Sequence, residues 1–238
     1  MDKTCQTFDQ AVEDVFDGAV IAVGGFFSSY HDSPFHLLEA LRAKEVGQLT
    51  IINNGAGDGE YGLGGLIKDG RVRKLISSFP NTPNATAFRE KYLAGLIELE
   101  VVPQGTLAER LRAGGAGIGG FYTRTGVHTE LAKGKEVRMI DGEEYLFEKP
   151  LKADFALIKA QLADPLGNLV FRGNMRNFNM VMAMAAKVVI AEVEEIVPVG
   201  TLTPEEIHTP GIFVDRVVLT APIPLNIKEQ GDKKVSAP

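Results

Sequence analysis

Short apolar runs alternate along this chain with segments in which apolar residues recur at helical spacing. The runs of strand length lie at 20–23, 49–52, 73–77 and 97–102, and the helical segments follow Pro34 and lie at 85–93 and 106–112. A helix between two strands brings the chain back in the same direction, so the strands lie parallel and the helices cover the sheet. The alternation predicts an α/β fold with an open, mostly parallel sheet flanked by helices.

The middle of the chain has a different pattern. Residues 137–140 and 145–147 flank an Asp141-Gly142 turn, which predicts a β-hairpin and hence a β-rich insertion. The first pattern then resumes, with strands expected at 155–162, 187–193 and 212–219 and a buried helix at 177–186. Residues 1–221 are predicted to form one domain. Proline and lysine dominate residues 222–238, which are predicted to form a flexible tail.

The composition excludes several kinds of partner. A net charge of -6 leaves no basic stripe that could neutralise a nucleic-acid backbone. The longest apolar stretch, 181–189, contains Lys187 and is too short to span a membrane. Cys5 is the only cysteine, which rules out an internal disulfide and favours a reducing compartment. Since the first residues also lack a signal-peptide pattern, we expect a cytoplasmic protein with no nucleic-acid and no membrane partner.

A glutamine amide stands at the start of a helical segment. Gln104 follows the apolar run at 97–102, and five glycines crowd residues 114–120. An amide N–H in this place could donate to an oxygen that becomes negatively charged during a reaction, with bare backbone beside it. The alternative is a structural glutamine that ties down the loop through backbone hydrogen bonds.

Gly24-Gly25-Phe26 lies between a predicted strand and a predicted helix. Bare backbone near a helix N-terminus can approach a phosphate or a pantetheine chain closely. The residues that follow do not complete the Gly-x-Gly-x-x-Gly pattern of dinucleotide binding. A tight turn with no ligand is the alternative.

Glu60 lies in a glycine-rich segment, 53–65, that is predicted to be a loop. A carboxylate there could act as a nucleophile or general base, although a solvated loop charge is the simpler interpretation. The four histidines are scattered without a zinc-type pattern, so no metal site is expected. No P-loop is present, and no Gly-x-Ser-x-Gly elbow surrounds Ser28 or Ser29.

Several segments, in order, resemble the A subunit of family I CoA-transferases, the 3-oxoacid and 3-oxoadipate enzymes. The resemblance covers roughly residues 17–219. It is carried by Pro103-Gln104-Gly105-Thr106 with its glycine-rich continuation, Asp154-Phe155-Ala156-Leu157, Gly167-Asn168-Leu169, Arg176-Asn177-Phe178-Asn179, and Ala191-Glu192-Val193 through to His208-Thr209-Pro210-Gly211.

The resemblance implies covalent, ping-pong catalysis. In the family, a glutamate attacks the acyl-CoA, an anhydride forms, and CoA returns to give a glutamyl thioester. That glutamate lies in a Ser-Glu-Asn-Gly segment of the B subunit, and this chain has no such segment. The family's oxyanion-hole glutamine corresponds to Gln104. Glu60-Tyr61-Gly62 mimics the partner's Glu-x-Gly and is interpreted as a decoy.

The resemblance also implies a CoA-associated loop, made here of Gly24, Gly25, Phe26, Phe27, Ser28, Ser29 and Tyr30. The family pattern is Gly-Gly-Phe-Gly-x-x-Gly-x-Pro. Phe27 and Tyr30 replace two of its glycines, and two extra residues precede Pro34. Bulkier side chains narrow the space above the turn, so the departure implies either a loop that no longer contacts CoA or an altered acyl pocket.

The expected partners follow from the same resemblance. They are a B subunit, in an A2B2 assembly, and as substrates succinyl-CoA and a 3-oxo acid, 3-oxoadipate before acetoacetate. CoA enters as a substrate, and no permanently bound cofactor is expected. Two alternatives stay open: a non-catalytic acyl-CoA-binding or regulatory protein on the same scaffold, and a self-sufficient hydrolase that uses Glu60.

Overall fold

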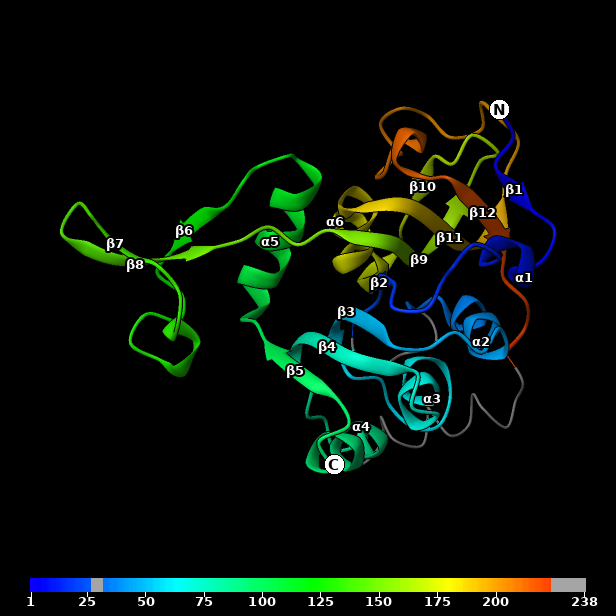
Figure 1. Ribbon diagram of the computed structural model, residues 1–238. Coiled ribbons are helices and arrows are strands. Elements are labelled where there is room, and N and C mark those ends of the chain that lie inside the picture. The colour runs from blue at the N-terminus through cyan, green and yellow to red at the C-terminus, as the bar shows by residue number, and fades with distance from the viewer. Residues whose placement is uncertain (27–31, 224–238) are drawn as a thin grey trace.

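The computed structural model describes residues 1–26 and 32–223, and a nine-stranded sheet forms its centre (Figure 1). Neighbouring strands follow the order β1-β12-β11-β9-β2-β3-β4-β5, and β10 pairs with β9. The pairs along this order are parallel, and the β9–β10 pair is antiparallel. The strands span Thr4–Cys5 (β1), Val20–Val23 (β2), Leu49–Gly55 (β3), Val72–Phe79 (β4), Glu98–Val101 (β5), Ala153–Ala163 (β9), Leu169–Val170 (β10), Ala186–Ile196 (β11) and Arg216–Leu219 (β12). The predicted open, mostly parallel sheet is confirmed.

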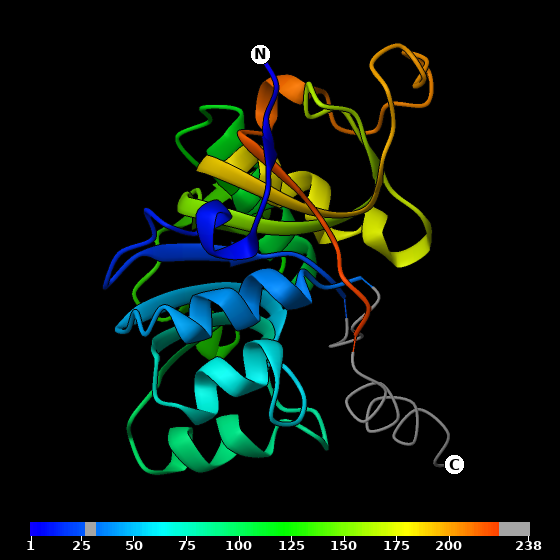
Figure 2. The same cartoon turned by 90° about the vertical axis from the view of Figure 1, so that its right-hand side faces the viewer.

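Helices cover both faces of this sheet (Figure 2). Successive residues of a strand point to opposite faces, so Ile21 and Val23 join the core beneath α1 to α4, and Ala22 joins the core beneath α5 and α6. Burial on both faces explains why these strands are continuous apolar runs in the sequence. The helices span Phe8–Ala11 (α1), Phe35–Ala43 (α2), Gly62–Lys68 (α3), Thr86–Leu93 (α4), Gln104–Gly115 (α5) and Phe178–Ala185 (α6).

The insertion in the middle of the chain is a separate antiparallel sheet that projects beside α5 (Figure 1). Its order is β6-β8-β7, from Phe121–Thr123 (β6), Val137–Ile140 (β7) and Glu143–Glu148 (β8). The predicted hairpin is therefore confirmed, and β6 adds a third strand to it. Arg110 of α5 ties the insertion to the main body, because its guanidinium donates to the Lys149 carbonyl at 2.8 Å.

Three of the differences from the sequence predictions change an element rather than shift its end by a few residues. Residues 62–68, predicted to be loop, form α3. The helix predicted at 106–112 runs from Gln104 to Gly115, so two glycines of the predicted loop lie in its last turn. The strand predicted at 212–219 divides into a 3-10 turn, Gly211–Phe213, and β12.

Most of the predicted tail, residues 224–238, lies outside the described residues, and the single domain over residues 1–221 stays a prediction. In the part of the chain that is described, every helix is too short or too polar to cross a membrane.

Candidate active site

Gln104 is the first residue of α5, just beyond the carboxyl end of β5. Pro103 precedes it and fixes the backbone at this helix start, where its missing N–H costs nothing. Gln104 is exposed, and within residues 1–26 and 32–223 its side-chain amide makes no hydrogen bond to the protein. Within the described residues, no hydrogen bond therefore supports the interpretation of Gln104 as a structural residue that ties down a loop.

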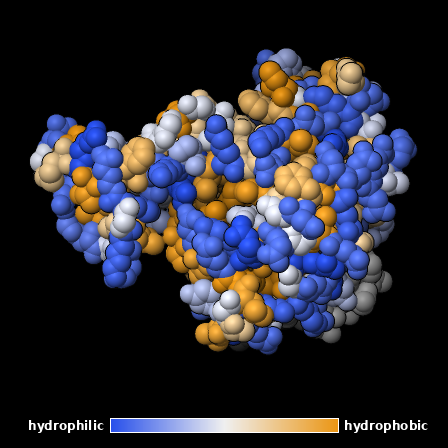
Figure 3. All heavy atoms as spheres, viewed as in Figure 1, coloured by the Kyte–Doolittle hydropathy of each residue, from blue (hydrophilic) through white to orange (hydrophobic). Residues whose placement is uncertain are grey.

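A cavity of about 270 Å³ opens beside Gln104. Its lining is mostly apolar and comes from the loop after β2, the first turns of α5, and the start of α6: Phe26, Gln104, Gly105, Ala108, Asn177, Phe178 and Val181. Hydrophobic residues are exposed between hydrophilic ones in the region of α5 and α6 (Figure 3). An apolar wall with a few polar groups at its edge is typical of a small-molecule site.

The glycine turn after β2 is held closely against its neighbours. The Gly24 N–H donates to the Leu157 carbonyl at 2.8 Å, which continues the pairing of β2 with β9. Gly25 has a φ of 107°, a conformation that favours glycine. Gly24 and Gly25 line a smaller space, of about 20 Å³, beside Asn53.

The structure thus brings some of the predicted site residues together. Phe26 and Gln104, which are far apart in sequence, line the same cavity. Gly24 and Gly25 lie next to it rather than in its wall. The other four predicted loop residues, Phe27, Ser28, Ser29 and Tyr30, lie outside the described residues.

Five lining residues were not among the predicted site residues: Gly105, Ala108, Asn177, Phe178 and Val181. Asn177 is exposed just before α6, and Phe178 is buried as its first residue. The Phe178 ring stacks on the Phe26 ring, with 6.3 Å between centroids and 13° between planes. The sequence signal that could have identified Asn177 and Phe178 was the segment Arg176-Asn177-Phe178-Asn179, which carries part of the family resemblance. Its periodicity indicates only a buried helix.

Glu60 does not line the cavity. It lies just before α3, with its side chain 67% exposed, and its carboxylate pairs with the Lys68 ammonium at 2.6 Å. The surroundings fit the interpretation as a solvated loop charge.

A buried carboxylate, that of Glu192, lies at the start of α2. The Glu192 carboxylate, in β11, accepts hydrogen bonds from Lys159 at 2.8 Å and Thr220 at 2.7 Å, and pairs with the His36 ring at 2.9 Å. Its other oxygen accepts from the backbone N–H groups of His36 and Leu37, at the start of α2. The N-cap residue of this helix, Pro34, has no side-chain acceptor, and Glu192 supplies one from a distant strand.

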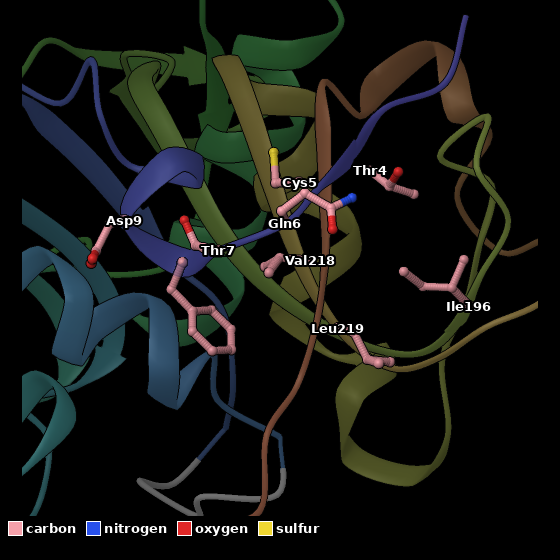
Figure 4. Close-up of a pocket in the computed structure, with 9 residues that line it drawn as sticks. Thr4, Cys5, Gln6, Thr7, Asp9, Ile196, Val218 and Leu219 are labelled. Carbon is pink, nitrogen blue, oxygen red and sulfur yellow. The ribbon is translucent and has the colours of Figure 1, made fainter.

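A second cavity, of about 550 Å³, lies between β1, α1 and the ends of β11 and β12 (Figure 4). It includes Cys5, and burial raises the pKa of this thiol. None of the predicted site residues lines it. Among residues 1–26 and 32–223, no three histidine, cysteine, aspartate or glutamate side chains lie close enough together to hold a metal ion.

Known proteins resemble this chain over most of its length. The A subunit of 3-oxoadipate CoA-transferase from Pseudomonas putida is 53% identical over 92% of this chain and 94% of its own length. The A subunit of succinyl-CoA:3-ketoacid coenzyme A transferase from Xanthomonas campestris pv. campestris is 52% identical over 92% of this chain and 90% of its own length.

Solved structures and the family match agree with these relatives. The crystal structure of glutaconate coenzyme A-transferase from Acidaminococcus fermentans has a TM-score of 0.78 and 24% identity, over 92% of this chain and 75% of that chain, and so shows the same fold. Residues 5–220 match the family described as Coenzyme A transferase. Together with the curated relatives, this match confirms the resemblance drawn from the sequence, and the chain belongs to the coenzyme A transferase family.

Proposed function

We propose that this chain is the A subunit of a CoA-transferase that moves CoA from succinyl-CoA to a 3-oxo acid. The names of the two relatives support 3-oxoadipate and, more generally, a 3-oxo acid as the acceptor. We propose 3-oxoadipate first and acetoacetate next. The observation that carries the proposal is Gln104, whose amide has no partner within the described protein and stands at the edge of a mostly apolar cavity. A cavity of about 270 Å³ has room for a short acyl group.

The proposed role of Gln104 is to stabilise negative charge. When the partner's glutamate attacks the acyl carbonyl, the carbonyl oxygen gains charge in the tetrahedral intermediate, and the Gln104 N–H donates to it. The C–S bond then breaks, which leaves an acyl-glutamyl anhydride and CoA thiolate. Attack of the thiolate on the glutamyl carbonyl releases succinate and gives the enzyme thioester, and the acceptor acid takes CoA by the same steps in reverse.

The loop that starts at Gly24 is proposed to contact CoA. Its glycine pair lets backbone approach a ligand closely, and Phe26 brings the loop to the same cavity as Gln104. CoA enters and leaves as a substrate in this proposal, and no cofactor stays bound.

The partner is proposed to be a B subunit that carries the nucleophile. The relatives' names, which each specify an A subunit, support a partner chain, and this sequence contains no Ser-Glu-Asn-Gly segment. We propose that the two subunits form an A2B2 assembly. We also propose that it works in the cytoplasm, because a single cysteine, Cys5, suits a reducing compartment.

The test is reconstitution. The chain is purified alone, with a candidate B subunit, and with a B subunit whose Ser-Glu-Asn-Gly glutamate is changed to alanine. We expect transfer of CoA from succinyl-CoA to 3-oxoadipate only in the intact mixture. Acyl-CoA binding without transfer in any mixture would favour the non-catalytic alternative.

Trapping the thioester locates the nucleophile. Borohydride reduction after incubation with succinyl-CoA, followed by peptide mapping, should label a glutamate of the B subunit. A label on Glu60, with hydrolysis of succinyl-CoA by this chain alone, would support the self-sufficient hydrolase and overturn the proposal.

A further inference from the structure

Asn179 makes contacts in three directions from a fully buried position in α6. Its side-chain carbonyl accepts from the Lys159 backbone N–H at 3.0 Å. Its amide nitrogen donates to the Met175 carbonyl at 3.0 Å and to the Asp32 carbonyl at 3.4 Å. Every polar atom of the side chain is therefore used, and each contact joins a different segment.

The contact with Lys159 explains why the chain leaves the sheet at Gly24. The strand β2 ends at Val23, which pairs with Leu157 of β9. Beyond that point the Lys159 N–H has lost its strand neighbour, and a buried N–H without an acceptor is costly. Asn179 supplies the acceptor and occupies the space beside β9 into which β2 would otherwise extend.

Gly24 lies directly against this amide. A Cβ added at Gly24 would overlap the Asn179 side-chain oxygen and approach the Ile158 Cα to 3.3 Å. The first residue of the proposed CoA-contacting loop is thus a glycine because of Asn179.

The far end of the loop is held by the same amide. The Asp32 carbonyl accepts from Asn179, and the Asp32 carboxylate accepts from the Phe26 N–H at 3.3 Å, so residues 26 and 32 are drawn together. Lys159 extends this network to Glu192, whose carboxylate holds the first N–H groups of α2, the helix that follows the loop.

We propose that Asn179 is the positioning residue that holds the glycine turn at Gly24 and the backbone of Asp32 in place for CoA binding. The inference rests on the function proposed for the loop that starts at Gly24. Asn179 itself lines no part of the cavity, but the neighbouring residues 177 and 178 do, so the same turn of α6 sets the loop and the cavity wall together.

The test separates the two substrates of the reconstituted enzyme. Succinyl-CoA brings CoA to the loop, whereas 3-oxoadipate meets an enzyme to which CoA is already covalently attached. In Asn179→Ala and Asn179→Asp we expect the KM for succinyl-CoA to rise about ten-fold while kcat and the KM for 3-oxoadipate change less than about two-fold. Asn179→Asp keeps the acceptor for Lys159 and loses the donor to both Asp32 and Met175, so it separates the contact with β9 from the other two.

Asn168→Ala is the matched control. Asn168 is also a side-chain amide that bridges backbone and side chain, between Asp164 and Gly211 in the turn after β9. The variant Asn168→Ala should lower the melting temperature while leaving the KM for succinyl-CoA unchanged. If Asn179→Ala behaves in the same way, Asn179 is only structural and the inference fails.

A double-mutant cycle tests the contact with Gly24. If Gly24→Ala acts by displacing Asn179, the double variant Gly24→Ala/Asn179→Ala should show the KM of Asn179→Ala alone. Effects on KM that multiply would mean that the two residues act separately, which also overturns the inference. Failure of the proposed function looks different, since the wild-type mixture would then transfer no CoA at all.

Discussion

Lys159 and Glu192 face each other in adjacent central strands, with the ammonium 2.8 Å from the carboxylate and both side chains buried. Burial by itself raises the pKa of Glu192, but the hydrogen bond from His36 and the charge of Lys159 outweigh it and lower the pKa to about 2. The carboxylate therefore stays ionised inside the protein.

The first prediction concerns acid stability. Since the pKa of Glu192 is below its ordinary value of 4.5 in the folded protein, its stabilisation is fully present above pH 4.5 and is lost as the pH falls toward 2. The loss amounts to about 3 kcal/mol in the free energy of unfolding. Urea unfolding of the purified protein between pH 2 and 5 measures it.

The variant Glu192→Gln should lose most of this pH dependence. It should also be less stable at pH 7, because it leaves the Lys159 charge buried without a counter-charge. The exposed Glu109→Gln serves as control and should follow the wild-type curve. A Glu192→Gln curve that parallels the wild type would show that other groups control the acid transition.

The second prediction concerns Gln104. In the reconstituted complex, Gln104→Ala should lower kcat by ~10²–10³ with little change in KM, since one oxyanion donor is removed. Gln104→Glu should be at least as harmful, because it places a like charge beside the oxyanion. The melting temperature should barely change, since the side chain is exposed and makes no hydrogen bond within the described protein. A lower melting temperature with preserved kcat per folded molecule would make Gln104 a structural residue.

The third prediction tests the cavity. Val181 lines it, and Val181→Phe should fill part of its volume of about 270 Å³. We expect the ratio of kcat/KM for 3-oxoadipate to that for acetoacetate to fall by about 10–100-fold, because the longer acid needs more of the space. Val199→Phe, at a residue 57% exposed and outside the cavity, is the control. An unchanged ratio in Val181→Phe would mean that the acceptor binds elsewhere.

The fourth prediction concerns the glycines at the end of α5. A Cβ on Gly115 would lie 2.5 Å from the Met184 carbonyl oxygen of α6, so Gly115→Ala should cost about 1–3 kcal/mol in stability by forcing the helices apart. Gly119 has no neighbour within 4 Å, and Gly119→Ala should be close to neutral. Thermal unfolding of both variants measures the contrast, and equal melting temperatures would show that α5 and α6 separate at no cost.

Sequence patterns predicted the parallel sheet because buried strands produce continuous apolar runs. They missed α3, since Gly62, Gly64 and Gly65 are typical of a loop. The reason for two of these glycines is tertiary: a Cβ on Gly64 would meet the Gly59 carbonyl, and one on Gly65 the Glu60 carbonyl. Packing against the preceding turn, which periodicity does not encode, outweighs the low helix propensity of glycine.

The lining of the cavity was predicted in part. Gln104 and Phe26 were singled out because each follows a strand in a recognisable segment, and they line one cavity because the carboxyl ends of parallel strands lie at one edge of a sheet. Asn177 and Phe178 were missed as lining residues because their helix is apolar on nearly all sides, so no pattern marks the side that meets α5. Glu192 was not predicted as a cap because it reaches α2 from a strand far along the chain.

The placement of β9 between β2 and β11 sets the order in which the molecule can be completed during synthesis. The unit of β2 to β5 contains only local crossovers, and it can form as soon as residues 20–101 have left the ribosome. The edge of β2 that will receive β9 then stays open until residues after 153 emerge, and β1 waits for β12. A nascent chain of this protein therefore exposes an unpaired, apolar strand edge for about a fifth of its synthesis, a period in which chaperones have a defined surface to protect.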